Sequence, residues 1–304
     1  MQDPEQAAQL GRCGFANLAG RPNVGKSTLL NRLVGQKIAA TTRRPQTTRN
    51  RLLGVVTEGQ DQLILVDTPG IHSRGKRLLN QTLNQTAIRS LGEADLVLFM
   101  IVAGQWRDDD ELILAHIRRA GKPVILVINK IDRLGKRADL LPFIDDVSRR
   151  FDFSEVVPVS ARTGANVARL QTVATGWLPR NPRFFDPEQV TDQSVRFIAG
   201  ELIREQVMER LGQELPYSAA VVVERFEEEG RLVRMWATVW VERESHRAIV
   251  IGAQGRKLKE IGSRSRQMLE PFLARRVYLQ LWVKTKERWQ DSRETIAAMG
   301  VDTD

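Results

Sequence analysis

Short apolar runs alternate with longer amphipathic segments from Gly14 to Leu178, and this alternation limits the possible folds more than any other feature of the chain. The runs have the length of buried strands, and the segments between them have the length of helices. Such an order favours an α/β fold, with a mostly parallel sheet covered by helices on both faces. Strands are predicted at Phe15–Ala19, Leu52–Thr57, Leu63–Val66, Leu96–Ala103, Val124–Ile128 and Val156–Val159, and helices at Ser27–Val34, Leu78–Leu91, Glu111–Arg119, Ala138–Phe151 and Val167–Trp177.

Three prolines between Pro179 and Pro187 end this regular pattern. Proline fixes φ and lacks the backbone N–H, so the stretch continues neither a helix nor a central strand. The rest is predicted as a helix, two strands, a short strand-like run into Gly252, a helix and a last strand, which suggests a smaller α+β domain. We predict a first domain at 1–180, a proline-rich linker at 181–193 and a second domain with a C-terminal helix at 194–304. The elements of this second domain are predicted at Ser194–Leu211, Tyr217–Phe226, Leu232–Val241, Gly255–Glu270 and Val277–Val283.

The segment Gly20-Arg-Pro-Asn-Val-Gly-Lys-Ser27 fits the phosphate-loop pattern GxxxxGK[ST] and lies between a predicted strand and a predicted helix. Its two glycines leave room for the loop backbone to wrap phosphate groups. Lys26 would supply a cation to the β- and γ-phosphates, and Ser27 a hydroxyl to Mg²⁺. The sequence therefore predicts a nucleoside triphosphate site at the carboxyl end of the first strand.

Three later motifs also follow predicted strands directly. Asp67-Thr-Pro-Gly70 places a carboxylate where it could hold Mg²⁺, directly or through water, and a glycine amide near the γ-phosphate. In Asn129-Lys-Ile-Asp132, the Asp132 carboxylate can accept two hydrogen bonds from guanine, a pairing that adenine cannot offer. Ser160-Ala161 could present a backbone amide to the guanine carbonyl. Together these motifs predict a site for GTP and GDP.

This set of motifs resembles the Era family of bacterial P-loop GTPases over nearly the whole chain. By this resemblance, Gln36–Thr48 would be the first switch and Gly70–Lys76 the second. Thr48 would be the threonine that closes on Mg²⁺ when GTP is bound, with Thr47 as the alternative. The family-like stretches are Gly14-Phe15, Gly20–Asn31, Pro45–Arg49, Asp67–Gly70, Ala138–Pro142 and Leu281–Lys284.

Hydrolysis is expected to be slow, because Ile71 stands where Ras-like enzymes carry a glutamine that orients water. Asn23 matches an asparagine that helps bind K⁺ in related GTPases, and the alternative is that it only supports a tight turn. The motifs and the resemblance together assign Lys26, Asn23, Gly70 and Thr48 to catalysis and Ser27, Thr48 and Asp67 to Mg²⁺. They assign nucleotide binding to Gly20, Asn23, Val24, Gly25, Lys26, Ser27, Thr28, Asp67, Gly70, Asn129, Lys130, Asp132, Ser160 and Ala161.

The stretch from Ile249 to Gly262 resembles a KH motif, in which a GxxG loop clamps a nucleic-acid backbone. The order of the elements is similar to the type II KH fold, and the alternative is a plain turn before a solvated basic helix. Between Arg243 and Arg293 there are 13 basic and 5 acidic residues, as expected for an anion-binding face. The residues expected at RNA are Gly252, Ala253, Gln254, Gly255, Arg256, Lys257 and Lys259, with Ile249, Ile251, Leu258 and Ile261 lining an apolar groove for the bases.

Other features of the composition argue against a membrane-spanning, secreted or zinc-binding protein. The longest apolar run, Leu96–Ala103, is far shorter than the roughly 18 residues that cross a bilayer, and the N-terminus does not read as a signal peptide. The single cysteine, Cys13, is expected to be a small buried side chain. The three histidines match no zinc-ligand spacing, so no structural metal is expected. A monomer in the cytoplasm is predicted.

The Era resemblance implies a GTP-hydrolysing switch that binds single-stranded rRNA near the 3′ end of 16S rRNA and acts in assembly of the 30S ribosomal subunit. One alternative is an RNA-binding module that holds the nucleotide only as a structural ligand, which Ile71 favours. Another is a GTPase at the periphery of the inner membrane, on its cytoplasmic side, which the net charge of +9 favours.

Overall fold

The computed structural model describes residues 10–42, 44, 47–71, 77–211 and 219–301. The chain divides into two compact units. The first comprises residues 1–38, 50–74 and 83–192, and the second comprises residues 39–49, 75–82 and 193–304. Most of the predicted first switch therefore belongs to the second unit, although in sequence it lies between two strands of the first. In the predicted second switch, residues 72–76 lie outside the described part of the chain.

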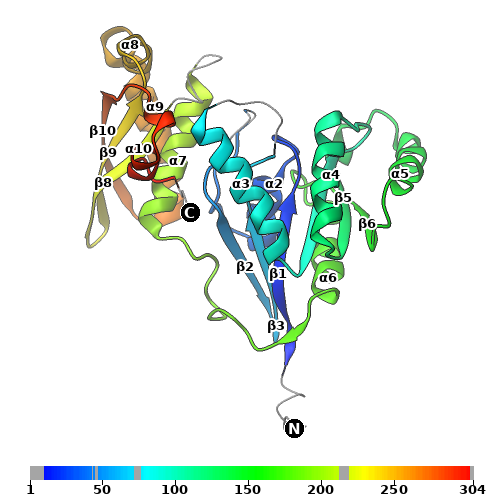
Figure 1. Cartoon of the computed structure of the whole chain (residues 1–304). Helices are drawn as coiled ribbons and strands as arrows, with labels where there is room; N and C mark the ends of the chain where they lie inside the picture. Colours follow the sequence, from blue (N-terminus) through cyan, green and yellow to red (C-terminus); the bar gives the residue numbers. More distant parts are fainter. Residues whose placement is uncertain (1–9, 43, 45–46, 72–76, 212–218, 302–304) are drawn as a thin grey trace. The chain divides into compact units, whose positions relative to one another are not determined.

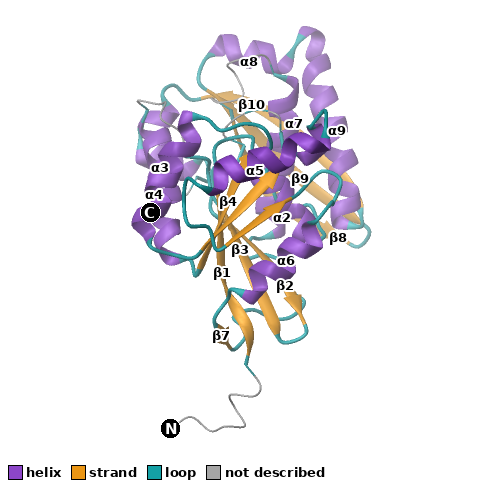
Figure 2. Ribbon diagram, turned by 90° about the vertical axis from the view of Figure 1, so that its right-hand side faces the viewer, coloured by secondary structure: helices purple, strands orange, loops and turns teal. Residues whose placement is uncertain are grey.

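The first unit contains a sheet with the strand order β2-β3-β1-β4-β5-β6. The short strand β7 pairs with the start of β1 (Figure 2). Neighbouring strands are parallel, except that β2 is antiparallel to β3 and β7 to β1. This sheet confirms the mostly parallel α/β fold predicted from the alternating pattern. The strands are β1 (Gly11–Ala19), β2 (Leu52–Glu58), β3 (Asp61–Asp67), β4 (Leu96–Val102), β5 (Val124–Asn129), β6 (Glu155–Pro158) and β7 (Arg180–Asn181).

Helices cover the sheet of the first unit. Helix α2 contacts β2 and β3, and helix α6 contacts β1, β3 and β6. A buried apolar cluster joins α3, α4 and α5 to β4 and β5. Every residue of β4 is buried, which explains why its sequence is continuously apolar rather than alternating. The helices are α2 (Lys26–Val34), α3 (Leu78–Glu93, with residues 83 onward in this unit), α4 (Asp108–Ala120), α5 (Leu140–Ser148) and α6 (Val167–Gly176).

The segment predicted as a linker runs back along the first unit as far as Asp192. The buried Gln62 side chain accepts hydrogen bonds from the amides of Phe184 and Phe185 and donates one to the Phe185 carbonyl. Farther along, the Val55 amide of β2 donates to the Val190 carbonyl at 2.9 Å. Residues 180–192 therefore form an edge segment held by the sheet.

The second unit is a three-stranded sheet with the order β10-β9-β8, in which β9 is parallel to β10 and antiparallel to β8. Helices α7 and α9 lie along one face of this sheet (Figure 1). Its apolar core joins side chains from both helices to β9 and β10. The elements are α7 (Val195–Arg210), β8 (Ala220–Glu229), β9 (Leu232–Val241), α8 (Glu244–Ile251), α9 (Arg256–Leu273), β10 (Arg276–Thr285) and α10 (Arg293–Ala298).

The run that leads into Gly252 is a helix, so the predicted short strand is wrong. The three apolar residues Ile249, Val250 and Ile251 are compatible with a strand, but they form the last turn of α8. Val250 is the one buried residue of this helix, so the apolar run does not have the continuous burial of a central strand. Among the described residues, no helix is both long enough and apolar enough to span a membrane.

Candidate functional site

The phosphate loop joins the end of β1 to the start of α2. The ammonium group of Lys26 donates to the Gly20 carbonyl at 2.9 Å, so in this structure it lies inside the loop. Burial lowers the pKa of Lys26, and the charge of Asp67 opposes this effect. Gly25 has φ of 110°, and a Cβ there would lie 2.4 Å from Nδ2 of Asn129. Only glycine fits at this position, as the pattern predicts.

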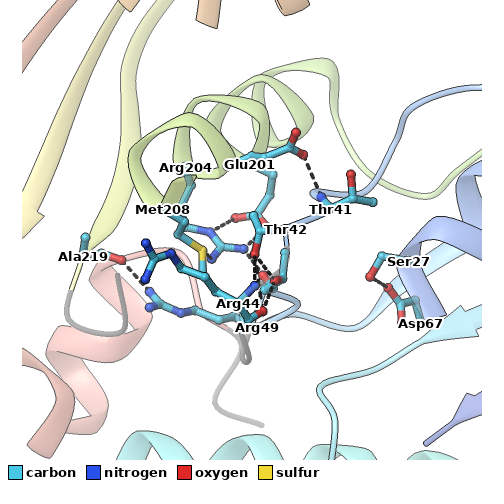
Figure 3. A network of polar contacts seen from close by, with 12 residues as sticks. Ser27, Thr41, Thr42, Arg44, Arg49, Asp67, Glu201, Arg204, Met208 and Ala219 are labelled. Carbon is cyan, nitrogen blue, oxygen red and sulfur yellow. Dashed lines mark hydrogen bonds and ion pairs between the residues drawn. The ribbon is translucent and has the colours of Figure 1, made fainter. Parts of the chain in front are cut away.

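Ser27, in the first turn of helix α2, and Asp67, the last residue of β3, face each other (Figure 3). The Ser27 hydroxyl donates to Oδ2 of Asp67 at 2.7 Å, and Asp67 is fully buried as the last residue of β3. A hydroxyl and a carboxylate are hard oxygen donors of the kind that Mg²⁺ takes beside nucleotide phosphates. The residues present therefore fit a magnesium ion bound together with a nucleotide.

Gly70 and Ile71 follow Asp67 closely. A Cβ on Gly70 would lie 2.8 Å from the backbone nitrogen of Pro22 in the phosphate loop, so this glycine lets the two backbones approach. Ile71 is 4% exposed and belongs to the apolar cluster of the first unit. Its side chain is part of the core, which gives a structural reason for an apolar residue at a position where Ras-like enzymes use glutamine.

Asn129 ties the motif predicted to read guanine to the phosphate loop. Its Nδ2 donates to the Val24 carbonyl at 2.7 Å, and its Oδ1 accepts from the amides of Lys130 and Ala161. The Lys130 ammonium donates to the Asn23 carbonyl at 2.5 Å. Of the remaining predicted residues, Thr28 lies in the first turn of α2. The structure thus brings the phosphate motif and the base motif together within the first unit.

Asp132 is the predicted guanine reader, and its carboxylate is already held by two neighbours. The Ser160 hydroxyl donates to Oδ1 at 2.6 Å, and the Arg162 guanidinium contacts Oδ2 at 2.7 Å. These hydrogen bonds, the one from Ser160 above all, lower the pKa of Asp132. The amides of Ser160 and Ala161, predicted to face guanine, donate within the protein to Ala165 and Asn129. The roles of the Ser160 hydroxyl and of Arg162 were not predicted from the sequence.

Residues 39–49, which include most of the predicted first switch (Gln36–Thr48) and Arg49 after it, belong to the second unit. Among the described residues of this segment, Thr41 and Thr47 are bonded to helix α7 (Figure 3). The Thr41 amide donates to Oε2 of Glu205 at 2.7 Å, and the Arg204 guanidinium donates to the Thr47 carbonyl. Both Arg204 and Glu205 are nearly fully buried. Thr48 lies in this same segment, so its predicted contact with Mg²⁺ stays a prediction.

Arg49 ends the segment and is buried in the second unit. Its Nη1 donates to the Ala219 carbonyl at 2.8 Å, and its guanidinium lies 5.6 Å from the ring centre of the fully buried Trp289. Burial, reinforced by the charge of Arg204, lowers the pKa of Arg49 to about 9. Arg77, the residue that follows the predicted second switch, is also bonded within the second unit, to Glu242 and Gln290.

The GxxG loop, Gly252–Gly255, joins α8 to α9. Gly252 and Gly255 both have positive φ, and a Cβ on Gly255 would meet no atom within 4 Å. The backbone of Gly255 therefore faces open space. Arg256 and Lys259 are exposed on α9 beside the loop, and Lys257 is half-buried. Of the predicted groove residues, Ile249 is 42% exposed, Ile251 and Leu258 are half-buried, and Ile261 is fully buried in the core.

Comparison with known proteins places these sites in one family. Residues 15–130 match the family model of a 50S ribosome-binding GTPase, and residues 214–290 match that of a KH domain. The chain is 48% identical over 290 residues to GTPase Era of Stenotrophomonas maltophilia, covering 95% of this chain and 97% of the relative. It is 43% identical over 289 residues to GTPase Era of Pseudomonas aeruginosa, covering 95% of each.

Two solved Era structures are similar over 95% of this chain and 99% of their own. One is a single-residue variant of Aquifex aeolicus Era bound to GDP and AlF4⁻, with a TM-score of 0.91 and 39% identity. The other is Era in complex with MgGDPNP and nucleotides 1506–1542 of 16S ribosomal RNA, with a TM-score of 0.92 and 39% identity. The chain therefore belongs to the Era family of P-loop GTPases.

Proposed function

We propose that the protein is a GTP-hydrolysing switch that binds single-stranded 16S rRNA near its 3′ end and acts in assembly of the 30S subunit. The single observation that carries the switch is that Thr41 and Thr47, in the predicted first switch, are held by Glu205 and Arg204 of helix α7 in the second unit. A segment that must close on Mg²⁺ and GTP is held by side chains of the RNA-binding unit. GTP and the KH domain therefore compete for the same residues, which links the two activities.

The nucleotide would lie on the phosphate loop, with Lys26 at its phosphates and Asp132 at guanine. Ser27 and Asp67 would hold Mg²⁺, and Thr48 would join them once Thr41 and Thr47 are released from helix α7. The metal would neutralise charge on the phosphates. Because the core residue Ile71 cannot orient water, the attacking water would be placed by backbone groups near Gly70, with K⁺ beside Asn23 offsetting developing charge. We expect slow turnover in the absence of RNA.

The RNA would lie on the GxxG loop, where Gly255 faces open space and Arg256 and Lys259 supply exposed positive charge. This assignment is supported by the KH family match and by the solved Era structure that contains 16S rRNA. The protein would act as a monomer in the cytoplasm. Attachment to the inner membrane is the alternative that liposome sedimentation without RNA would test.

The test measures RNA binding and GTP turnover in matched variants. Gly255→Asp places a carboxylate in the open space above the loop, and we expect it to weaken binding of a 16S 3′-end oligonucleotide by about tenfold or more. Gly230→Asp is the control, because Gly230 also has positive φ and open space around it but lies in the β8–β9 turn. Gly230→Asp therefore adds the same charge and a similar backbone strain, but in the β8–β9 turn instead of the GxxG loop.

Turnover is then measured in K⁺ and in Na⁺ buffer, with and without the oligonucleotide. The proposal expects the oligonucleotide to change turnover of the wild type and of Gly230→Asp, and Gly255→Asp to lose this response. Equal RNA affinity in all three proteins would overturn the KH assignment. If GTP were hydrolysed no faster with the protein than in buffer alone under every condition, the proposed GTPase activity would be refuted. The nucleotide would then be only a structural ligand.

A further inference from the structure

The side chain of Arg21, the second residue of the phosphate loop, is bonded to helix α4 and to the residues that precede it. Its Nε donates to Oδ2 of Asp110 at 3.1 Å, and its Nη2 donates to Oε1 of Gln105 at 3.3 Å. The Arg21 side chain is 9% exposed and that of Asp110 is 0% exposed. Neither Arg21 nor Asp110 was predicted from the sequence to have a role.

Asp110 gives this arginine a fixed anchor. It lies in the first turn of α4, where its Oδ2 also accepts a hydrogen bond from the Arg107 amide at 3.1 Å. One and two turns farther along α4, Ile113, Leu114 and Ile117 are buried in the apolar cluster that joins this helix to the central strands. The carboxylate is therefore attached to a helix whose buried face is packed into the apolar cluster of the first unit.

The backbone of Arg21 acts on the lysine that would bind phosphate. The Lys26 ammonium donates to the carbonyls of Gly20 and Arg21, at 2.9 and 3.5 Å, and the Val24 amide also donates to the Arg21 carbonyl. The Gly20–Arg21 limb of the loop thus holds the ammonium group. The opposite limb, Asn23–Val24, is fastened separately by Asn129 and Lys130 of the base motif.

The buried Arg21–Asp110 ion pair is not well explained by a contribution to folding stability alone. A buried ion pair often contributes no more than two well-packed apolar side chains would, because both charges lose their hydration. Its attraction is directional, however, and it fixes the orientation of the groups that it joins. In this chain the group that it orients is the loop limb whose carbonyls hold Lys26.

We propose that the Arg21–Asp110 pair is a positioning device that fixes the first limb of the phosphate loop, and through it Lys26, for the β-phosphate of the nucleotide. Neither side chain touches the nucleotide. Because the second limb and the guanine site are held by other residues, loss of the pair weakens recognition of phosphate and spares recognition of the base. This inference rests on the GTP site proposed above.

The test compares dissociation constants for GDP and GMP, which share the base and differ by the β-phosphate. For Arg21→Met and for Asp110→Leu we expect binding of GDP to weaken by about tenfold to a hundredfold, with binding of GMP within about twofold of the wild type. Arg107→Ala is the control, because it removes an exposed positive charge beside Gln105 while its backbone amide still reaches Asp110.

Each single variant leaves one buried charge without its partner, so the double variant Arg21→Met/Asp110→Leu is measured as well, and thermal unfolding is followed for all. We expect the double variant to regain thermal stability but not GDP affinity. The proposal would be overturned if the ratio of the dissociation constants for GDP and GMP stayed at the wild-type value in the variants. It would also be overturned if this ratio returned to the wild-type value together with thermal stability in the double variant. A wild type that binds neither nucleotide would instead refute the GTP site.

Discussion

Replacing Glu205 by alanine should release the Thr41 amide from helix α7 while leaving the fold of the second unit intact. The bond is an N–H donating to a buried carboxylate at 2.7 Å, and Glu205 is 3% exposed. Hydrogen bonds to charged groups contribute about 1.5–3 kcal/mol. If opening of residues 39–42 governs exchange, the Thr41 amide should exchange about 10- to 150-fold faster in the variant.

Hydrogen exchange followed by mass spectrometry on a peptide covering residues 38–42 measures this directly. The matched control is Glu209→Ala, which lies on the same helix, is half-exposed and pairs only loosely with Arg210 at 3.7 Å. Protection of the same peptide in the wild type should also differ between the protein loaded with GDP and the protein loaded with a non-hydrolysable GTP analogue. Equal exchange in both variants and the wild type would refute the reasoning that Glu205 holds the switch.

Three further outcomes follow from the described contacts. Asp132→Ala should lower the preference for GTP over ATP by at least about 100-fold in competition binding, because two charge-assisted hydrogen bonds are lost, and an unchanged preference would contradict the base site. The pKa of Asp132 is lowered in the folded state, chiefly by the hydrogen bond from Ser160. The contribution of Asp132 to stability is therefore present above the unfolded pKa of about 4 and is lost as the pH falls through the lower folded pKa. Ser160→Ala removes this hydrogen bond and should shift acid unfolding to higher pH in a circular dichroism titration. Phe99→Ala should cost about 3–5 kcal/mol in urea unfolding, because Phe99 is fully buried against Trp106 and Phe153, whereas Leu141→Ala, at 73% exposure, should cost less than about 0.5 kcal/mol.

The placement of the predicted nucleotide motifs beside one another could be predicted because each motif is a short, local stretch of sequence. The phosphate loop, the Asp67 motif and the Asn129 motif each follow a strand of the same sheet, so that finding the strands also placed the motifs at one edge. The buried isoleucines and valines of β4 and β5 and the glycines of the loop carry this signal in short, continuous stretches.

The residues that were not predicted act across long separations in sequence. Arg21 and Asp110 are 89 residues apart, and Thr41 and Glu205 are 164 apart. No periodicity or spacing joins such partners, because the pairing is created by packing of the elements that carry them. The mistaken strand before Gly252 has a different cause, since three apolar residues in a row fit either a strand or the end of a helix.

The edge segment formed by residues 180–192 has a consequence for how the first unit behaves when it is cut from the chain. Strand β2 is the outermost strand of its sheet, and the amides of Leu53 and Val55 point outward to Asp192 and Val190. An uncovered edge of this kind offers donors and acceptors to any other extended chain and so favours aggregation. Here the protein's own chain fills the edge before it enters the KH domain. A fragment that ends at Asp192 keeps the edge covered, whereas a fragment that ends at Arg180 exposes β2 to other copies of itself.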